Sequence, residues 1–320
     1  MENLLILSSG TRNKIVQYFK KELGNSGKVI CADMSKYAPS LYEGDNHYIT
    51  PNIMNDDYIN FILDICKKES IDGIFSLIDP ELKILGENKH LFTDEGIMLL
   101  QSSVDLINVS FDKYKFYTTL IEEGFNTQKS YIELYKVLTD INEGKLMFPL
   151  FVKPNLGSAS FNINKINNIE SLKSMFEKHN DLIVQEFIDG QEYGIDVYVD
   201  FISKEVISIF IKEKMKMRAG ETDKSIAVKD KKLTQVIKNF VENLGYVGQI
   251  DIDVFKKAGE YYISEVNPRF GGGYPHAYEA GCNFPRYILN NLKGKVNKSE
   301  VDNYSEGTIM MKYSDVKFLK

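Results

Sequence analysis

The stretch from Tyr261 to Gly273 constrains the fold of this chain more than any other. It reads Tyr-Tyr-Ile-Ser-Glu-Val-Asn-Pro-Arg-Phe-Gly-Gly-Gly. Side chains alternate along a strand, so Glu265 and Asn267 share one face. The proline that follows them has no backbone N–H to donate and ends the pairing. The stretch therefore predicts a strand that delivers two oxygen ligands and Arg269 into a glycine-rich loop.

A second strand-like run, Gln249–Phe255, lies just upstream and shows the same alternation, with its carboxylates on one face. The link Lys257–Gly259 has the length and composition of a three-residue hairpin loop, with glycine at the position that needs a positive φ. We therefore expect Lys256 and Glu260 to close an antiparallel hairpin.

This register decides which side chains meet across the hairpin. It places Asp251 opposite Glu265 and leaves Asp253 level with Ile263. Two residues along a strand span about 6.6 Å, so Asp253 is expected to lie too far away to share an ion with Glu265 and Asn267. Asp251, Glu265 and Asn267 form an oxygen-rich set that suits Mg²⁺. The alternative is a surface hairpin with scattered acids, but Glu-x-Asn-Pro-Arg before three glycines is an unusual end for an ordinary strand.

The composition excludes several classes of protein. The chain has 320 residues, 43% hydrophobic and 26% charged, as expected for a soluble globular protein with two or three packed subdomains. A net charge of −6 argues against a nucleic-acid-binding face. Cys31, Cys66 and Cys282 have no metal-ligand spacing and are expected to be reduced thiols. Because no run suits a membrane span or a signal peptide, we expect a cytoplasmic protein.

The first hundred residues alternate between short apolar strands and amphipathic helices. Strands are expected at Leu4–Leu7, Val29–Asp33 and Gly73–Ile78. This alternation predicts a parallel sheet, whose ligands gather beyond the carboxyl ends of the strands. The dinucleotide fingerprint Gly-x-Gly-x-x-Gly is absent, because Gly10 is the only glycine in the first loop, so a nicotinamide enzyme is disfavoured.

The pattern changes near Ser110, which could cap a helix that opens at Asp112. Farther on, the strand Phe148–Pro154 carries Lys153 and enters the small-residue run Asn155–Ser160. Backbone N–H groups in such a run can approach an anion, and a lysine adds charge. A plain hairpin turn would explain the segment equally well.

The remaining strands are expected to build a second, antiparallel sheet. They include Gly194–Val199 and Val206–Lys212. An amphipathic helix that ends at Gly245 precedes the two strands of the hairpin. The polar run from Lys212 to Asp223, which contains Arg218, has few apolar anchors and is expected to be a mobile loop.

Four short motifs follow one another along the chain. They are Asp112-Lys113, Val152-Lys153-Pro154, Gln185-Glu186-Phe187-Ile188 with Glu192, and Glu265-Val266-Asn267-Pro268-Arg269. In this order and spacing they resemble the ATP-grasp superfamily, and within it the carbamoyl-phosphate-synthase-like branch, over nearly the whole chain. The resemblance implies an α/β, Rossmann-like parallel-sheet domain in residues 1–109 and an α+β, two-lobed ATP-grasp domain in residues 110–320. The nucleotide cleft would lie between subdomains of about 110–187 and 188–320.

The resemblance also implies roles for individual residues. The residues that would bind ATP are Lys113, Lys153, Ser158, Ser160, Glu186, Phe187, Ile188 and Glu192, the last of them through the ribose hydroxyls. Asp251, Glu265 and Asn267 would hold Mg²⁺, for which Mn²⁺ could substitute. Arg218 and Arg269 would face the γ-phosphate and the acyl phosphate.

These features predict an ATP- and Mg²⁺-dependent ligase that joins a small-molecule carboxylate to an amine through an acyl phosphate and releases ADP and phosphate. One alternative is single-module carboxyphosphate chemistry, although this chain has one ATP-grasp copy where the carbamoyl phosphate synthetase large subunit has two. Another is a non-catalytic ATP-binding regulator. The sequence leaves open the two substrates, whether the protein is a homodimer, and whether His276 or Glu81 contacts substrate.

Overall fold

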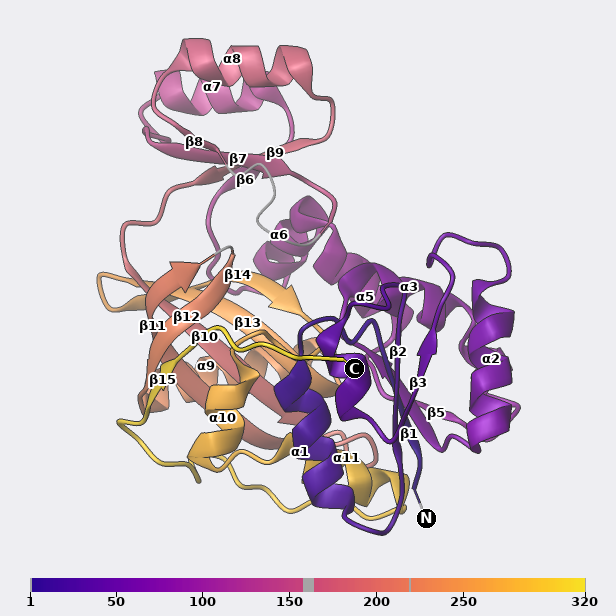
Figure 1. Cartoon of the computed structure of the whole chain (residues 1–320). Helices are drawn as coiled ribbons and strands as arrows, with labels where there is room; N and C mark the ends of the chain where they lie inside the picture. The colour runs from indigo at the N-terminus through magenta and orange to yellow at the C-terminus, as the bar shows by residue number, and fades with distance from the viewer. Residues whose placement is uncertain (1, 158–163, 219, 320) are drawn as a thin grey trace.

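The strands of the described residues form three sheets, each built from a different part of the chain (Figure 1). The computed structural model describes residues 2–157, 164–218 and 220–319. The expected combination of an N-terminal parallel sheet with a two-lobed, largely antiparallel second part is confirmed. The division into domains 1–109 and 110–320 remains a prediction.

The first sheet is parallel and has the strand order β3-β2-β1-β4-β5. Its strands are β1 (Leu4–Leu7), β2 (Val29–Asp33), β3 (Asn46–Ile49), β4 (Gly73–Ser76) and β5 (Met98–Leu99). The apolar residues of β1, β2 and β4 are buried on both faces, as is typical of parallel sheets. The helices that pack on and beside it are α1 (Asn13–Leu23), η1 (Pro39–Glu43), α2 (Tyr58–Glu69), α3 (Asp79–Glu87), α4 (Lys89–Thr93) and α5 (Val104–Phe111).

The second sheet forms a small lobe at the top of Figure 1 and has the strand order β6-β9-β7-β8. Its strands are β6 (Ser130–Tyr131), β7 (Leu150–Pro154), β8 (Asn164–Ile166) and β9 (Leu182–Glu186). α7 (Leu134–Asn142) and α8 (Ile169–Lys178) bury their apolar sides against it. α6 (Lys113–Glu122) follows α5 and leads into this lobe.

The third sheet is the largest and has the order β14-β13-β10-β11-β12-β15. Its strands are β10 (Gln191–Val199), β11 (Val206–Arg218), β12 (Glu221–Ala227), β13 (Gly248–Lys257), β14 (Glu260–Asn267) and β15 (Ile309–Met311). All of its pairings are antiparallel. One face packs on the amphipathic helix α9 (Lys231–Leu244), which ends, as expected, at Gly245 in the left-handed conformation.

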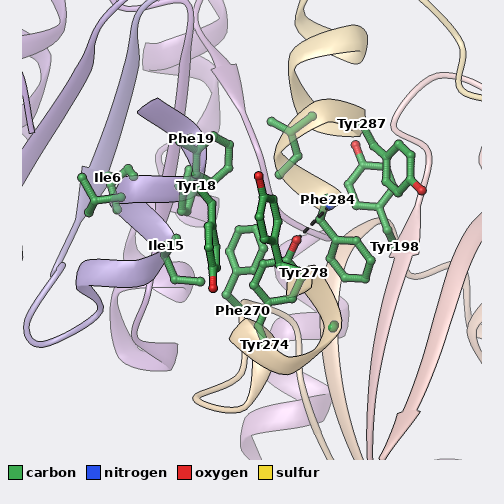
Figure 2. Close-up of a cluster of buried hydrophobic side chains, with 14 of the residues drawn as sticks. Ile6, Ile15, Tyr18, Phe19, Tyr198, Phe270, Tyr274, Tyr278, Phe284 and Tyr287 are labelled. Atoms are coloured by element: carbon green, nitrogen blue, oxygen red, sulfur yellow. Dashed lines mark hydrogen bonds between the residues drawn. The ribbon is translucent and has the colours of Figure 1, made fainter. Parts of the chain in front are cut away.

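A cluster of buried aromatic side chains joins the first sheet to the third (Figure 2). Tyr18 of α1 stacks on Tyr278 of α10 (Tyr274–Ala280), with 3.7 Å between ring centroids. Phe19 of α1 meets Phe270 edge to face at 5.9 Å. α11 (Phe284–Leu292) packs into the same cluster. Because the two sheets share one core, the loops at the ends of the parallel strands are held in place against the large sheet.

The hairpin of β13 and β14 has a different register from the predicted one. Its loop contains two residues, Ala258 and Gly259, with φ of 51° and 82°, and Lys257 pairs with Glu260. Positive φ at both turn residues matches the right-handed twist of the strands, which favours a two-residue turn over the expected three-residue loop.

A β-bulge at Ser264 then shifts the pairing by one residue. Asp253 therefore lies opposite Glu265, and Asp251 lies opposite Asn267. The prediction that Asp251 pairs with Glu265, with Asp253 level with Ile263, is wrong. The bulge adds one unpaired residue to β14. Beyond it, Asp253 and Glu265 face the same side of the sheet, as do Asp251 and Asn267.

The described residues of the polar run from Lys212 to Asp223 lie on two paired strands, so the prediction of a loop there is wrong, while its mobility stays a prediction. β11 continues through it to Arg218, and β12 returns from Glu221. The charged residues of this run are compatible with a strand because several have ionic partners, of which Lys212, paired with Asp196, is the most deeply buried.

Candidate active site

A cavity of about 470 Å³ lies where the three sheets meet. Residues of the small lobe, the large sheet and the ends of the parallel strands all line it. The structure brings together in its wall seven of the predicted site residues: Lys113, Lys153, Glu192, Asp251, Glu265, Asn267 and Arg269. Lys113 and Arg269 lie 156 positions apart in sequence, so the fold assembles the site from segments in both halves of the chain.

The other predicted residues have different locations. Of those that the structure describes, four lie outside the cavity lining: Glu186, Phe187, Ile188 and Arg218. The ring of Phe187 lies 5.4 Å from that of Phe151, which does line the cavity. Arg218 is exposed near the tip of its hairpin, with its Nε 3.2 Å from Asp223. Ser158 and Ser160 lie outside the described residues.

Lys113 projects from the first turn of α6. The cap of this helix is Asp112, whose carboxylate accepts hydrogen bonds from two backbone N–H groups of the first turn, whereas Ser110, expected as the cap, lies within α5. Lys113 Nζ donates to the carbonyl oxygen of Gly157 at 2.5 Å. Burial lowers the pKa of the Lys113 ammonium, and the carboxylate of Glu265 partly opposes this effect. The lysine is therefore held at the cavity wall, beside the loop that follows β7.

Lys153 connects the two lobes across the cavity. It lies on β7 of the small lobe, and its Nζ is 3.7 Å from Oε2 of Glu265 on β14. Both side chains are largely buried. A cation and an anion from opposite lobes thus meet at the place where a phosphate and a metal ion are predicted to bind.

Arg269 is held between two carboxylates. Its Nε and Nη2 both donate to Oδ2 of Asp79 at 3.2 Å, and its Nη1 lies 3.7 Å from Oδ2 of Asp251. Burial would lower the pKa of the guanidinium, but these carboxylates outweigh it and raise the pKa. Burial, together with the charge of Asp253, raises the pKa of Asp251 to about 6. The site therefore combines a fixed cation, Arg269, with a carboxyl group, Asp251, whose pKa is raised toward neutral pH.

Two lysines of β11 extend the charged region along the large sheet. Lys212 pairs with Asp196, and each side chain is 1% exposed. Lys214 lies between two carboxylates, 2.8 Å from Glu192 and 2.6 Å from Asp253. The lysines of β11 therefore neutralise carboxylates of the neighbouring strand β10 and of β13 beyond it.

A second charged group lies in the wall of the cavity toward the parallel sheet. Arg12, from the loop after β1, forms an ion pair with Glu221 of β12 at 2.7 Å. Lys312, just after β15, binds the same carboxylate at 2.6 Å. This group connects three segments that are remote in sequence, and Arg12 and Glu221 both line the cavity.

The three glycines after Arg269 provide space for charged side chains. A β-carbon on Gly271 would lie 2.5 Å from the carboxylate of Asp251, and one on Gly272 would lie 2.6 Å from Nη1 of Arg12. A β-carbon on Gly273 would lie 2.7 Å from Cε of Lys212. Within the described residues none of the three has a positive φ, so close approach, not backbone conformation, is what requires glycine here.

Sequence reasoning missed several residues of the cavity wall: Arg12, Asp79, Lys214, Glu221 and Asp253. Two of them, Arg12 and Asp79, follow the carboxyl ends of β1 and β4, where ligands of parallel sheets gather, so their position was a usable signal. The sequence contained no comparable signal for Lys214 and Glu221, because their strands were taken for a loop.

Two residues whose contact with substrate was left open are packed inside the protein. His276 bonds through Nδ1 to Ser225 and through Nε2 to the carbonyl of Thr308. Glu81 is fully buried, and its carboxylate accepts hydrogen bonds from Tyr58 and Ser76. Neither lines the cavity, whereas Asp79, two residues before Glu81, does.

The donor atoms of the predicted metal set fit Mg²⁺. In residues 2–157, 164–218 and 220–319, no group of three or more His, Cys, Asp or Glu side chains is arranged to hold an ion. The predicted set, however, contains the carboxylates of Asp251 and Glu265 and the amide of Asn267, all in the cavity wall. Mg²⁺ prefers such oxygen donors and usually completes its shell with water and substrate phosphates.

Among the helices of the described part of the chain, none has the length and apolar character that crossing a lipid bilayer requires.

Two family models match this chain. A "PylC-like, N-terminal domain" matches residues 4–100, and an "ATP-grasp domain" matches residues 110–273. The second match covers just over half of the chain, including the small lobe and the hairpin of β13 and β14.

The related proteins include a synthase and a ligase. The chain is 26% identical over 244 residues to the carbamoyl phosphate synthase large chain of Thermoanaerobacter sp. (strain X514), a match covering 71% of this chain and 22% of that one. It is 28% identical over 230 residues to the D-alanine–D-alanine ligase of Ruminiclostridium cellulolyticum, covering 62% of this chain and 60% of that one. The matched region thus spans less than a quarter of the first relative and less than two thirds of the second.

A solved structure shows the same fold. The biotin carboxylase domain of the Hydrogenobacter thermophilus 2-oxoglutarate carboxylase, in complex with Mg-ADP, ADP and bicarbonate, superimposes with a TM-score of 0.76 at 17% identity. The match covers 96% of this chain and 73% of that one. With the motifs, the two-lobed architecture and the family match in agreement, the chain belongs to the ATP-grasp family.

Proposed function

We propose that this protein is an ATP- and Mg²⁺-dependent ligase that joins a small-molecule carboxylate to an amine through an acyl phosphate. The observation that carries the proposal is that one cavity gathers two lysines from the small lobe side, one arginine and an oxygen-donor set from the β13–β14 hairpin. Phosphoryl transfer requires positioning and neutralisation of charge more than covalent catalysis, and these residue types supply both.

In the first step, a carboxylate oxygen of the acid substrate attacks the γ-phosphorus of ATP, and the bond from that phosphorus to the β,γ-bridging oxygen breaks. ADP leaves, and the acid becomes an acyl phosphate. Lys113 and Lys153 would hold the phosphates, and Arg269, fixed by Asp79, would stabilise the charge on the transferred group. Glu192 would accept hydrogen bonds from the ribose hydroxyls.

In the second step, the amine attacks the acyl carbon, the bond from that carbon to the phosphate oxygen breaks, and phosphate leaves. The amine loses one proton to water or to a carboxylate of the site, so atoms and charges balance. Water must be kept out meanwhile, because it would hydrolyse the acyl phosphate. The tip of the β11–β12 hairpin, which lines the cavity through Met217 and Thr222, would help to exclude it.

A bound Mg²⁺ would supply neutralisation of the nucleotide phosphates. Asp251, Glu265 and Asn267 are the residues that would hold it, and the hairpin bulge is what places them on one face.

The decisive experiment is a screen of carboxylates and amines for ADP release. A ligase releases ADP only when both substrates are present. ADP release with bicarbonate alone would favour carboxyphosphate chemistry, for which the bicarbonate in the complex of the similar biotin carboxylase domain is a precedent. Tight ATP binding without turnover on any substrate pair would favour a regulator.

Calorimetry tests nucleotide binding separately from turnover. Lys153→Ala should weaken ATP binding by about 10- to 100-fold, because it removes a charge-assisted phosphate contact. Lys173→Ala, on the exposed side of α8 in the same lobe, is the matched control and should leave the affinity unchanged. The proposal also includes a cytoplasmic location and leaves a homodimer as one possible assembly.

A further inference from the structure

Lys214 is a buried cation that the proposed reaction does not use. Its side chain is 5% exposed, lies in the wall of the cavity, and donates to Oε1 of Glu192 at 2.8 Å. The same Nζ is 2.6 Å from Oδ1 of Asp253. The two carboxylates outweigh burial and raise the pKa of Lys214, so the lysine stays charged. A buried charge is tolerated only when it is paired, and these two carboxylates are the ionic partners of Lys214.

A glycine inside a central strand allows this contact. Lys214 lies on β11 and Asp253 on β13, and β10 runs between them. At the crossing point β10 has Gly194, which pairs with Lys212 on one side and with Asp253 on the other. A β-carbon on Gly194 would lie 3.0 Å from Cε of Lys212 and 3.1 Å from Cε of Lys214, closer than most side-chain contacts. Glycine weakens a strand interior, and it often marks a place where another group must approach closely.

The two partners of Lys214 belong to different halves of the proposed site. Glu192 is the residue expected to bind the ribose of ATP, and Asp253 lies opposite the expected metal ligand Glu265. One lysine therefore connects the sugar end of the nucleotide site to the hairpin at its phosphate end. Its bond to Glu192 uses Oε1, and the second oxygen, Oε2, is the atom that a ribose hydroxyl would reach.

We propose that Lys214 is a positioning residue that fixes the carboxylate of Glu192 for ribose recognition and anchors it to the β13–β14 hairpin through Asp253. The inference rests on the proposed nucleotide-binding function of the same cavity. A free glutamate has three rotatable side-chain bonds, and the ion pair removes that freedom before the nucleotide arrives. Lys214 thereby makes the site selective for ribose over 2′-deoxyribose without touching the sugar.

The test is calorimetry with Mg-ATP and Mg-2′-deoxyATP, since a site built to hydrogen-bond a hydroxyl rejects the analogue that lacks it. Wild-type protein should prefer ATP by roughly tenfold or more. Lys214→Met should reduce this preference to less than about twofold, and Glu192→Gln should have the same effect. The double variant should lose no more than either single variant, because both act on one contact. Lys214→Arg should retain most of the preference, since arginine supplies the same charge.

Matched controls and contrary outcomes separate the proposal from its alternatives. Lys216→Met removes an exposed lysine two residues along the same strand and should leave the preference intact. If Lys214→Met weakens ATP and 2′-deoxyATP equally, the lysine is a phosphate contact and the proposal is wrong. The proposal is also wrong if Lys214→Met protein, shown by circular dichroism to be folded, keeps the preference for ATP over 2′-deoxyATP. Failure of the wild type to bind ATP at all would instead remove the proposed function, and this inference with it.

Discussion

The two faces of the large sheet are made by alternate residues of the same strands, yet their chemistry differs. On one face, Ile195, Ile209 and Ile252 pack against α9 and its neighbours. The other face, toward the cavity, has Asp196 on β10 and Lys212 on β11 in place of apolar residues. Both faces are buried at this level of the sheet.

This difference shows that buried side chains can stabilise the folded protein in two ways. On the apolar face each side chain contributes nearly independently, because the hydrophobic effect is non-directional. On the charged face a side chain is tolerated only as a member of a pair, since one partner alone would be an uncompensated buried charge. The following predictions compare the two faces, beginning with the largest expected effect.

Lys212→Met should destabilise the protein by about 3–5 kcal/mol, because it leaves the carboxylate of Asp196 buried without its counterion. Burial already raises the pKa of that carboxyl, and Lys212 opposes the rise. Adding Asp196→Asn should recover much of the loss. Urea unfolding of the two single variants and the double variant measures the coupling. If the losses in unfolding free energy of the two single variants simply add in the double variant, Lys212 and Asp196 do not depend on each other, and the charged face behaves like the apolar one.

Ile195→Ala, on the opposite face of the same strand, should cost about 3 kcal/mol through lost transfer energy and the cavity left behind. Ile195→Val should cost about 1 kcal/mol. No single substitution should rescue the alanine variant, because its neighbour Ile252 needs no specific partner. The same urea titrations check this, and a rescue by a polar substitution nearby would contradict it.

His276→Gln should flatten the dependence of stability on pH between about 6.5 and 4. The histidine is 3% exposed, and burial, assisted by the charge of Lys212, lowers its pKa to about 4. Between these pH values His276 is protonated in the unfolded chain but neutral in the folded protein, so stability falls as the pH falls. The loss amounts to at most about 3 kcal/mol at pH 4. Parallel pH slopes of unfolding free energy in wild type and variant would show that His276 titrates normally.

Asp251→Asn should reduce turnover by roughly a hundredfold, about 2.7 kcal/mol in activation free energy, while Asp253→Asn should reduce it by less than about tenfold. Asp253 is already neutralised by Lys214, whereas Asp251 is the acid beside Arg269 and Gly271. Steady-state ADP release measures both, with thermal unfolding as the control for folding. A larger loss with Asp253→Asn would assign the metal to the aspartate opposite Glu265.

The sequence predicted those parts of the fold that depend on local pattern. β1 and β2 were located to the residue, because continuous apolar runs bounded by polar loops have few other interpretations. The hairpin register was missed for two reasons: the loop has two residues and not three, and a bulge at Ser264 leaves no mark in composition or periodicity. The polar run from Lys212 to Asp223 was taken for a loop because it has few apolar residues. The partners of its lysines, Asp196 and Glu192, lie on another strand, and no local pattern reveals such a pairing.

Site residues that belong to sequence motifs could be predicted, whereas those that reach the cavity through contacts between sheets could not be assigned to it from the sequence. Lys113, Lys153 and Glu265 were found from motifs and do line the cavity. Arg12 and Asp79 follow the ends of β1 and β4, which marked them as candidates, but their place in this cavity also depends on the core that joins the parallel sheet to the large sheet. Their role depends on a contact between sheets, which the order of motifs along the chain does not specify.

The glycines 271–273 have a consequence for how this protein can vary among its relatives. Each missing β-carbon leaves room for a side chain from a distant segment, so the positions should change together. A relative with alanine in place of Gly272 should have shorter side chains at the positions of both Arg12 and Glu221. Alanine in place of Gly271 has no such remedy, because the aspartate it would displace is already the shortest acid. Position 271 should therefore be the least variable of the three.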